Sequence, residues 1–80
     1  MSRVIVYSQP GCGACRAEKD WLSQQGVAFE DRDIRAKPEW LQEIRVLGSQ
    51  ATPTTVVETE WGREVVIGFD RALLSKLLGL

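Results

Sequence analysis

Residues 4–22 read VIVYSQPGCGACRAEKDWL and contain the clearest indication of the fold. The β-branched run Val4–Tyr7 predicts a short buried strand, which ends in a loop that contains Pro and Gly. Residues 15–25 contain neither Gly nor Pro, so they predict a helix. Cys12 and Cys15 therefore lie between a strand and the first turn of a helix.

The predicted helix has one defined face and a clear end. Glu18, Trp21, Leu22 and Gln25 share one side of it, since they recur at helical spacing. Gly26 follows, where a left-handed residue commonly ends a helix. The turn after Gly26 then leads into the next segment.

The remaining segments alternate between strand and helix patterns, and their order predicts an α/β fold. A βαβαββα order favours a right-handed crossover between the first two strands and a closing hairpin. We therefore expect a four-stranded mixed sheet flanked by three helices, in a single domain spanning residues 1–80. The predicted segments are a strand at 27–31, a helix from Pro38 to Gly48, hairpin strands at 54–58 and 64–67, and a helix after Asp70.

Composition limits the kind of partner this chain binds. It has 80 residues, of which 44% are hydrophobic and 26% charged, and its formal net charge is -1. Lys and Arg are spread along the sequence, so we expect neither nucleic-acid binding nor membrane binding. The first apolar run is too short for a signal peptide, and nothing else could span a membrane, so a cytoplasmic location is expected.

The two cysteines predict redox chemistry. In a reducing cytoplasm a permanent structural disulfide is not expected, which leaves catalysis, redox sensing, metal binding or burial. Cys12 at the helix N-terminus is expected to be the exposed, more acidic thiol and the nucleophile, and Cys15 the shielded resolving thiol. A helix dipole contributes only about 0.3–1 kcal/mol, so Arg16 or Lys19 would have to add to the activation.

Other uses of the cysteines are less consistent with the sequence. The chain contains no histidine, which excludes a Cys-His protease dyad and leaves a mononuclear zinc site two ligands short unless two chains share it. We therefore expect no metal site. We do not expect the two cysteines to be inert core residues, because the Gly-rich loop before the helix is an exposed place. A further hypothesis is a redox-controlled binding module, which would show no turnover.

Two further segments allow both structural and functional interpretations. A cis bond at Thr52-Pro53 would turn backbone groups toward a substrate chain, but base rates favour an ordinary trans proline at a strand entrance. Gly68-Phe69-Asp70 forms either a simple turn with a helix cap or a place where backbone and Asp70 hold a polar group.

Taken together, these segments resemble glutaredoxins, particularly the glutaredoxin-like branch that includes NrdH-redoxins and mycoredoxins. The similarity spans nearly the whole chain. It rests on Val4–Tyr7, on Cys12 and Cys15 with Ala17, Lys19 and Leu22, on Gly26 before Phe29-Glu30, on Pro53-Thr54, and on Gly68-Phe69-Asp70.

The resemblance implies a thioredoxin fold and a thiol-disulfide oxidoreductase. Cys12 would be the nucleophile and Cys15 the resolving cysteine, acting on protein disulfides or on mixed disulfides with low-molecular-weight thiols. No bound cofactor is implied beyond such a thiol as co-substrate. By the same resemblance the Thr52-Pro53 bond is cis, the backbone of Thr52 pairs with the substrate, and Gly68, Phe69 and Asp70 line the site. We expect Gln9 to contact the substrate as well.

Several positions depart from the family pattern. Glutaredoxins usually carry a cation and a tyrosine where this chain has Gln9 and Ala14, and both help to hold glutathione. Phe69 replaces a common glycine, as in the NrdH type, which accepts electrons from thioredoxin reductase. The reductant therefore stays open between thioredoxin reductase and a low-molecular-weight thiol such as glutathione, mycothiol or bacillithiol.

Gly13 keeps a second class of function open. Motifs with glycine at this position occur among relatives that hold a [2Fe-2S] cluster between two subunits, so the alternative is a dimeric cluster carrier or sensor using Cys12. The redoxin interpretation, in contrast, predicts a monomer.

Overall fold

The computed structural model describes residues 3–80, and its helices and strands follow the predicted βαβαββα order. Within that range the strands are β1 (Arg3–Ser8), β2 (Glu30–Asp33), β3 (Thr54–Thr59) and β4 (Gly62–Ile67). The helices are α1 (Gly13–Gln24), α2 (Pro38–Val46) and α3 (Arg71–Leu78).

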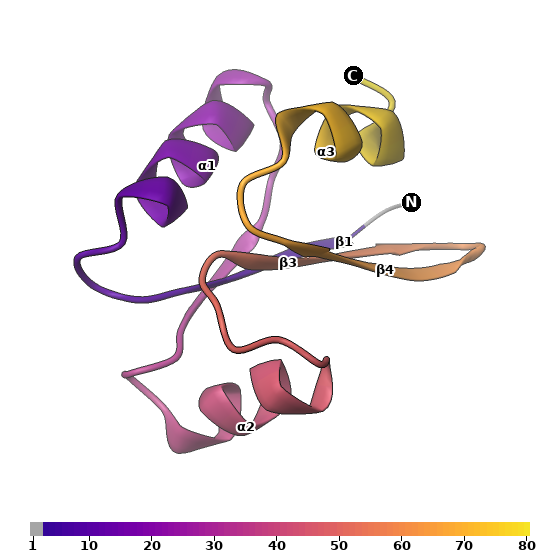
Figure 1. Cartoon of the computed structure of the whole chain (residues 1–80). Helices are drawn as coiled ribbons and strands as arrows, with labels where there is room; N and C mark the ends of the chain where they lie inside the picture. The colour runs from indigo at the N-terminus through magenta and orange to yellow at the C-terminus, as the bar shows by residue number, and fades with distance from the viewer. Residues whose placement is uncertain (1–2) are drawn as a thin grey trace.

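The strands form one mixed sheet in the order β2-β1-β3-β4. β1 and β2 pair in parallel, whereas β3 pairs antiparallel with both β1 and β4. Helices α1 and α3 cover one face of this sheet and α2 covers the other (Figure 1). The predicted four-stranded mixed sheet with three flanking helices, a thioredoxin fold, is therefore confirmed.

Alternation along the strands supplies a core on each face of the sheet, because successive side chains of a strand point to opposite sides. Val6 and Val57 face α1 and α3, and Ile5 and Val56 face α2. The buried members of the first core are Val4, Val6, Trp21, Leu22, Val57, Val66 and Leu74. Those of the second are Ile5, Tyr7, Ile44 and Val56.

The second strand begins later than the sequence pattern predicts. We expected it at 27–31, but pairing with β1 covers Glu30–Asp33. The amide of Val27 still bonds to the carbonyl of Leu22 (2.9 Å), so this residue belongs to the end of α1. Val27 and Phe29 do pack against the core. Their apolar character therefore marked burial rather than strand pairing.

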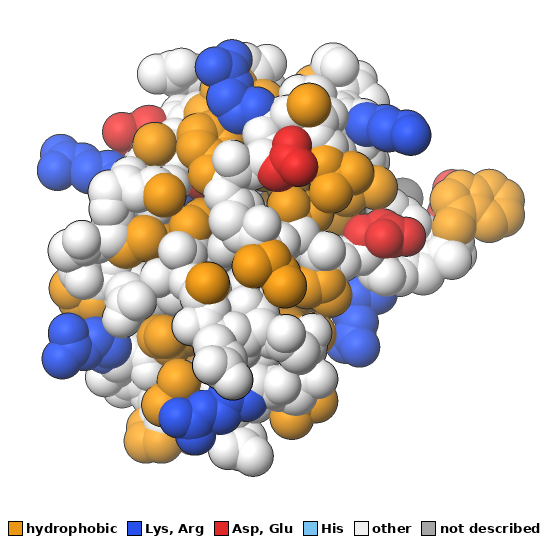
Figure 2. All heavy atoms as spheres, in the orientation of Figure 1, with side chains coloured by type: hydrophobic (Ala, Val, Ile, Leu, Met, Phe, Trp, Pro, Cys, Tyr) orange, Lys and Arg blue, Asp and Glu red, His pale blue; other side chains and the backbone are white. Residues whose placement is uncertain are grey.

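Charged side chains are dispersed, not clustered, on the face of the molecule that is drawn in Figure 2. Figure 2 shows Lys and Arg side chains dispersed around the visible face, with acidic and apolar side chains between them. The most exposed aromatic residue among those described is Trp61, at the β3–β4 turn, with 91% of its surface accessible. No helix within residues 3–80 is long and apolar enough to cross a membrane.

Candidate active site

The two cysteines form a disulfide at the start of α1. Cys12 is the N-cap residue and is half-buried, whereas Cys15 retains only 1% of its accessible surface. Their Cα atoms are 5.3 Å apart, and the amide of Cys15 donates to the Cys12 Sγ (3.1 Å). Cys12 is thus the sulfur that a partner can reach, and backbone N–H groups at a helix N-terminus favour an anion there.

Two other loops meet this end of α1. The Thr52-Pro53 bond is cis, as the resemblance implied and against the base rate for proline. The Thr52 carbonyl oxygen lies 3.6 Å from the Cys12 Sγ. The amide of Gly68 donates to the carbonyl of Pro53 (2.8 Å), which ties the β4–α3 turn to the same place. Residues far apart in the sequence are therefore brought together around one sulfur atom.

Gln9 also belongs to this group. Its side-chain Nε2 donates to the Thr52 Oγ1 at 2.8 Å. The loop before Cys12 and the residue before Pro53 are therefore held to each other. Gln9 thus contacts a predicted substrate-binding residue; its own contact with substrate stays a prediction.

Phe69 and Asp70 have structural contacts of their own. The ring of Phe69 packs against that of Trp21, with centroids 5.8 Å apart and the rings tilted by 52°. The Asp70 carboxylate accepts from the amide of Leu73 (3.0 Å) and caps α3, as predicted. These contacts fix the turn; the substrate contacts of both residues remain predictions.

An open hollow of about 570 Å³ lies beside the disulfide, on the α1 side. Cys12, Cys15, Arg16 and Lys19 all line it. Lys19 is paired with Asp31, Nζ to Oδ2 at 2.9 Å, so its charge is already shared with a carboxylate. The influence of Arg16 and Lys19 on the thiols stays a prediction.

Glu18 is a member of the site region that sequence reasoning did not single out. Its side chain is fully buried, and the Thr55 hydroxyl donates to its Oε2. No hydrogen-bond partner for its Oε1 lies among residues 3–80. Burial raises the pKa of Glu18, while the Thr55 hydrogen bond lowers it. The sequence signal was a carboxylate on the same helical face as Trp21 and Leu22.

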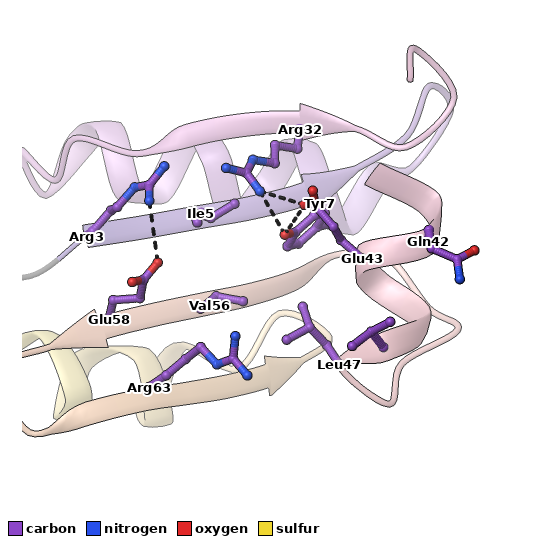
Figure 3. A pocket seen from close by; sticks show the side chains of 11 residues that line it. Arg3, Ile5, Tyr7, Arg32, Gln42, Glu43, Leu47, Val56, Glu58 and Arg63 are labelled. Carbon is purple, nitrogen blue, oxygen red and sulfur yellow. Dashed lines mark hydrogen bonds and ion pairs between the residues drawn. The ribbon is translucent and has the colours of Figure 1, made fainter. Parts of the chain in front are cut away.

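A second pocket lies on the opposite, α2 face of the sheet (Figure 3). It has a volume of about 320 Å³, and in it Arg32 contacts both the Tyr7 hydroxyl (3.1 Å) and the Glu43 Oε1 (2.6 Å). Burial, followed by the Glu43 hydrogen bond, raises the pKa of Tyr7. Neither cysteine lines this pocket. We therefore assign these side chains to the packing of α2 on the sheet.

The metal-ligating residue types are dispersed in this part of the chain. No group of three His, Cys, Asp or Glu side chains within residues 3–80 is placed to hold a metal ion. The contacts that the structure shows to the Cys12 sulfur are instead with backbone groups, the amide of Cys15 and the carbonyl of Thr52.

A thioredoxin fold with a Cys-x-x-Cys disulfide at the start of α1, beside a cis proline, defines a redoxin-type protein. Residues 4–61 match the sequence profile of the glutaredoxin family. The chain belongs to the glutaredoxin family.

Individual relatives agree with that assignment. The glutaredoxin-like protein NrdH of Lactococcus lactis (strain IL1403) is 36% identical over 50 residues, which cover 62% of this chain and 69% of that protein. The solved thioredoxin-like protein BC3987 is 32% identical with a TM-score of 0.82, over 94% of this chain and 99% of that one. The NrdH-redoxin of Escherichia coli shares the fold at 23% identity, with a TM-score of 0.81 over 94% and 93% of the chains.

Proposed function

We propose that this protein is a thiol-disulfide oxidoreductase that reduces protein disulfides, or mixed disulfides with low-molecular-weight thiols. The observation that carries the proposal is the asymmetry of the cysteine pair. Cys12 is half-buried at the helix N-terminus, beside the Thr52 carbonyl, while Cys15 is 1% exposed. Membership of the glutaredoxin family supports the same assignment.

The proposed reaction has two steps. The Cys12 thiolate attacks one sulfur of the substrate disulfide, so a mixed disulfide forms and one substrate thiolate leaves. Cys15 then attacks the Cys12 Sγ; the Cys12–Cys15 bond forms and the second substrate thiol is released. The substrate gains two electrons and the protein loses two. Backbone groups of Thr52, next to the Cys12 sulfur, would align the incoming chain.

An external reductant must return those two electrons. We propose thioredoxin reductase or a low-molecular-weight thiol in this role, in a reducing compartment such as the cytoplasm. The E. coli NrdH-redoxin is described as glutaredoxin-like with a thioredoxin-like activity profile, which supports the first choice. This chain has Gln9 and Ala14 where glutaredoxins usually carry a cation and a tyrosine that help to hold glutathione, which also favours thioredoxin reductase.

The test is a reconstituted turnover assay with a disulfide-bonded protein substrate. Thioredoxin reductase with NADPH is compared with glutathione, mycothiol and bacillithiol as electron sources. We expect turnover with at least one source and none for Cys12→Ser, whose fold is checked by circular dichroism. Full activity of Cys12→Ser would contradict the proposal. If reduced protein instead gives a coloured dimer on anaerobic reconstitution with iron and sulfide, without turnover, the cluster alternative is favoured.

A further inference from the structure

Glu18 is a buried carboxylate that the proposed reaction does not yet use. It is 0% exposed and lies on the same face of α1 as the buried Cys15, which precedes it by three residues. Residues three apart on a helix are neighbours, with Cβ atoms about 5–6 Å apart. A carboxylate in this position is unfavourable unless its oxygens are satisfied, and among residues 3–80 only Oε2 has a partner, the Thr55 hydroxyl.

The partner of Glu18 lies on the strand that follows the loop beside the disulfide. Thr55 lies on β3, three residues after Thr52, whose carbonyl is 3.6 Å from the Cys12 Sγ. Glu18 is therefore fixed both by the helix that carries Cys15 and by the strand that follows the cis proline. A carboxylate held from two sides loses little further entropy in reacting, which suits proton transfer.

Other charged groups around this face are few and are already engaged or exposed. From β2, Asp31 accepts from both Ser8 and Lys19. From α3, Asp70 caps its own helix and Arg71 lies over the Trp21 ring at 5.5 Å. β4 contributes the exposed Glu64, and β3 contributes only Thr55, which carries no charge. The carboxylates of Asp31, Glu64 and Asp70 are all exposed, whereas Glu18, on α1 itself, is buried.

We propose that Glu18 takes the proton of the Cys15 thiol as Cys15 attacks the mixed disulfide on Cys12. The inference rests on the proposed function. In this step the S–H bond of Cys15 breaks and its proton passes to the Glu18 carboxylate. The Cys15 sulfur bonds to the Cys12 Sγ, and the substrate thiolate leaves with the electron pair of the broken bond. When the protein is reduced again, Glu18 returns the proton to the departing Cys15 thiolate.

Burial makes Glu18 better suited to this transfer than an exposed glutamate. An ordinary carboxyl group and an ordinary thiol differ by roughly four pKa units, so proton transfer between them is uphill. Burial raises the pKa of Glu18 toward that of a thiol. Proton transfer is most efficient when the two groups are close in acidity, and a positioned acid or base typically contributes about 10²–10⁴-fold.

The test follows the two steps separately. Reduced protein is mixed in a stopped-flow instrument with 5,5′-dithiobis(2-nitrobenzoate), which releases one coloured thiolate when Cys12 attacks and a second when Cys15 closes the disulfide. For Glu18→Gln we expect an unchanged first release and a second release at least about tenfold slower near neutral pH. The difference should shrink above the thiol pKa, where Cys15 ionises without help. Glu64→Gln, an exposed carboxylate on β4, is the matched control.

Each outcome has a distinct meaning. If the first release is absent in the wild-type protein, or survives in Cys12→Ser, the proposed function fails. If wild type shows both releases and Glu18→Gln matches it at every pH, or is faster, only the role of Glu18 fails. If Glu18→Gln does not fold, the Glu18 carboxyl carbon is followed by NMR in the wild type. Two titration steps in the reduced protein and one in the oxidised protein are expected; identical curves would overturn the inference.

Discussion

The side-chain amide of Gln9 donates a hydrogen bond of 2.8 Å to the hydroxyl of Thr52. This bond joins the loop that precedes Cys12 to the residue that precedes the cis proline. The Thr52 carbonyl in turn lies 3.6 Å from the Cys12 sulfur. The position of the backbone beside the reactive sulfur therefore depends on two side chains outside the cysteine motif.

Thr52→Val tests that dependence, because valine keeps the shape of threonine and removes the acceptor. A hydrogen bond of this kind contributes about 0.5–1.5 kcal/mol, so we expect kcat/KM for a disulfide substrate to fall roughly 2- to 10-fold. Thr59→Val, at the far end of β3, is the control and should leave kcat/KM unchanged. Equal values for Thr52→Val and wild type would show that the contact does not position the site.

Glu18 also predicts how stability changes with pH. Burial raises its pKa in the folded state above the ordinary value of 4.5, so the folded protein binds this proton more readily than the unfolded chain. The contribution of the protonated Glu18 carboxyl to the free energy of unfolding is fully present at low pH and is lost as the pH rises through the folded-state pKa. Glu18→Gln does not titrate there. Its stability relative to wild type should therefore increase as the pH rises above about 4.5, measured by urea denaturation. A constant difference would contradict this.

The Arg32 cluster on the α2 face should stabilise the fold without affecting the redox reaction. The Arg32 side chain is 17% exposed and contacts Glu30, Glu43 and Tyr7. We expect Arg32→Met to lower the free energy of unfolding by about 1–3 kcal/mol, because it leaves the Glu43 carboxylate without its charged partner. Arg3→Met, at a 57% exposed side chain, should change it by less than about 1 kcal/mol. Similar losses in both variants would exclude a special role for Arg32.

The same cluster should weaken in acid. The hydrogen bond from Arg32 holds the pKa of Glu30 below its ordinary value of 4.5. A depressed carboxyl pKa gives stability that is present above the ordinary value and is lost as the pH falls through the folded-state pKa. The difference in the free energy of unfolding between wild type and Arg32→Met should therefore become smaller below about pH 4.5. A difference that stays constant into acid would contradict the ion pair.

Asp70 allows its two interpretations to be separated. Its carboxylate caps α3 at the amide of Leu73, and an N-cap aspartate replaced by alanine typically lowers stability by about 0.5–2 kcal/mol. Asparagine caps nearly as well and carries no charge. We expect Asp70→Asn to keep wild-type stability and to raise KM for charged thiol substrates if the carboxylate also binds substrate. An unchanged KM would leave Asp70 with the cap alone.

Local patterns predicted the elements well because they report local physics. The uninterrupted run after Cys15 and the glycine at position 26, whose φ is 72°, correctly marked α1 and its end. Apolar periodicity did not mark the start of β2, since Val27 and Phe29 are partly buried against the core but do not pair with β1. Burial and strand pairing give the same signal in sequence and differ only in three dimensions.

The parts of the site that were not predicted depend on long-range contacts. Residues alone favoured a trans Pro53, and only the family resemblance indicated the cis bond. Glu18 was seen as part of a helical face, but its contact with Thr55 joins positions 37 residues apart. The Tyr7–Glu43 contact similarly spans 36 residues. No local pattern encodes such pairs, because the sheet brings them together.

Trapping of the first intermediate tests whether Cys12 is the nucleophile. Cys15→Ser is reduced, mixed with a peptide disulfide, and analysed by intact mass and peptide mapping. Without a resolving thiol, the predicted result is one stable peptide adduct per protein, located on Cys12, and no comparable adduct on Cys15 in Cys12→Ser. Equal adduct formation at Cys15 in Cys12→Ser, or none at Cys12 in Cys15→Ser, would contradict the assignment of Cys12 as the nucleophile.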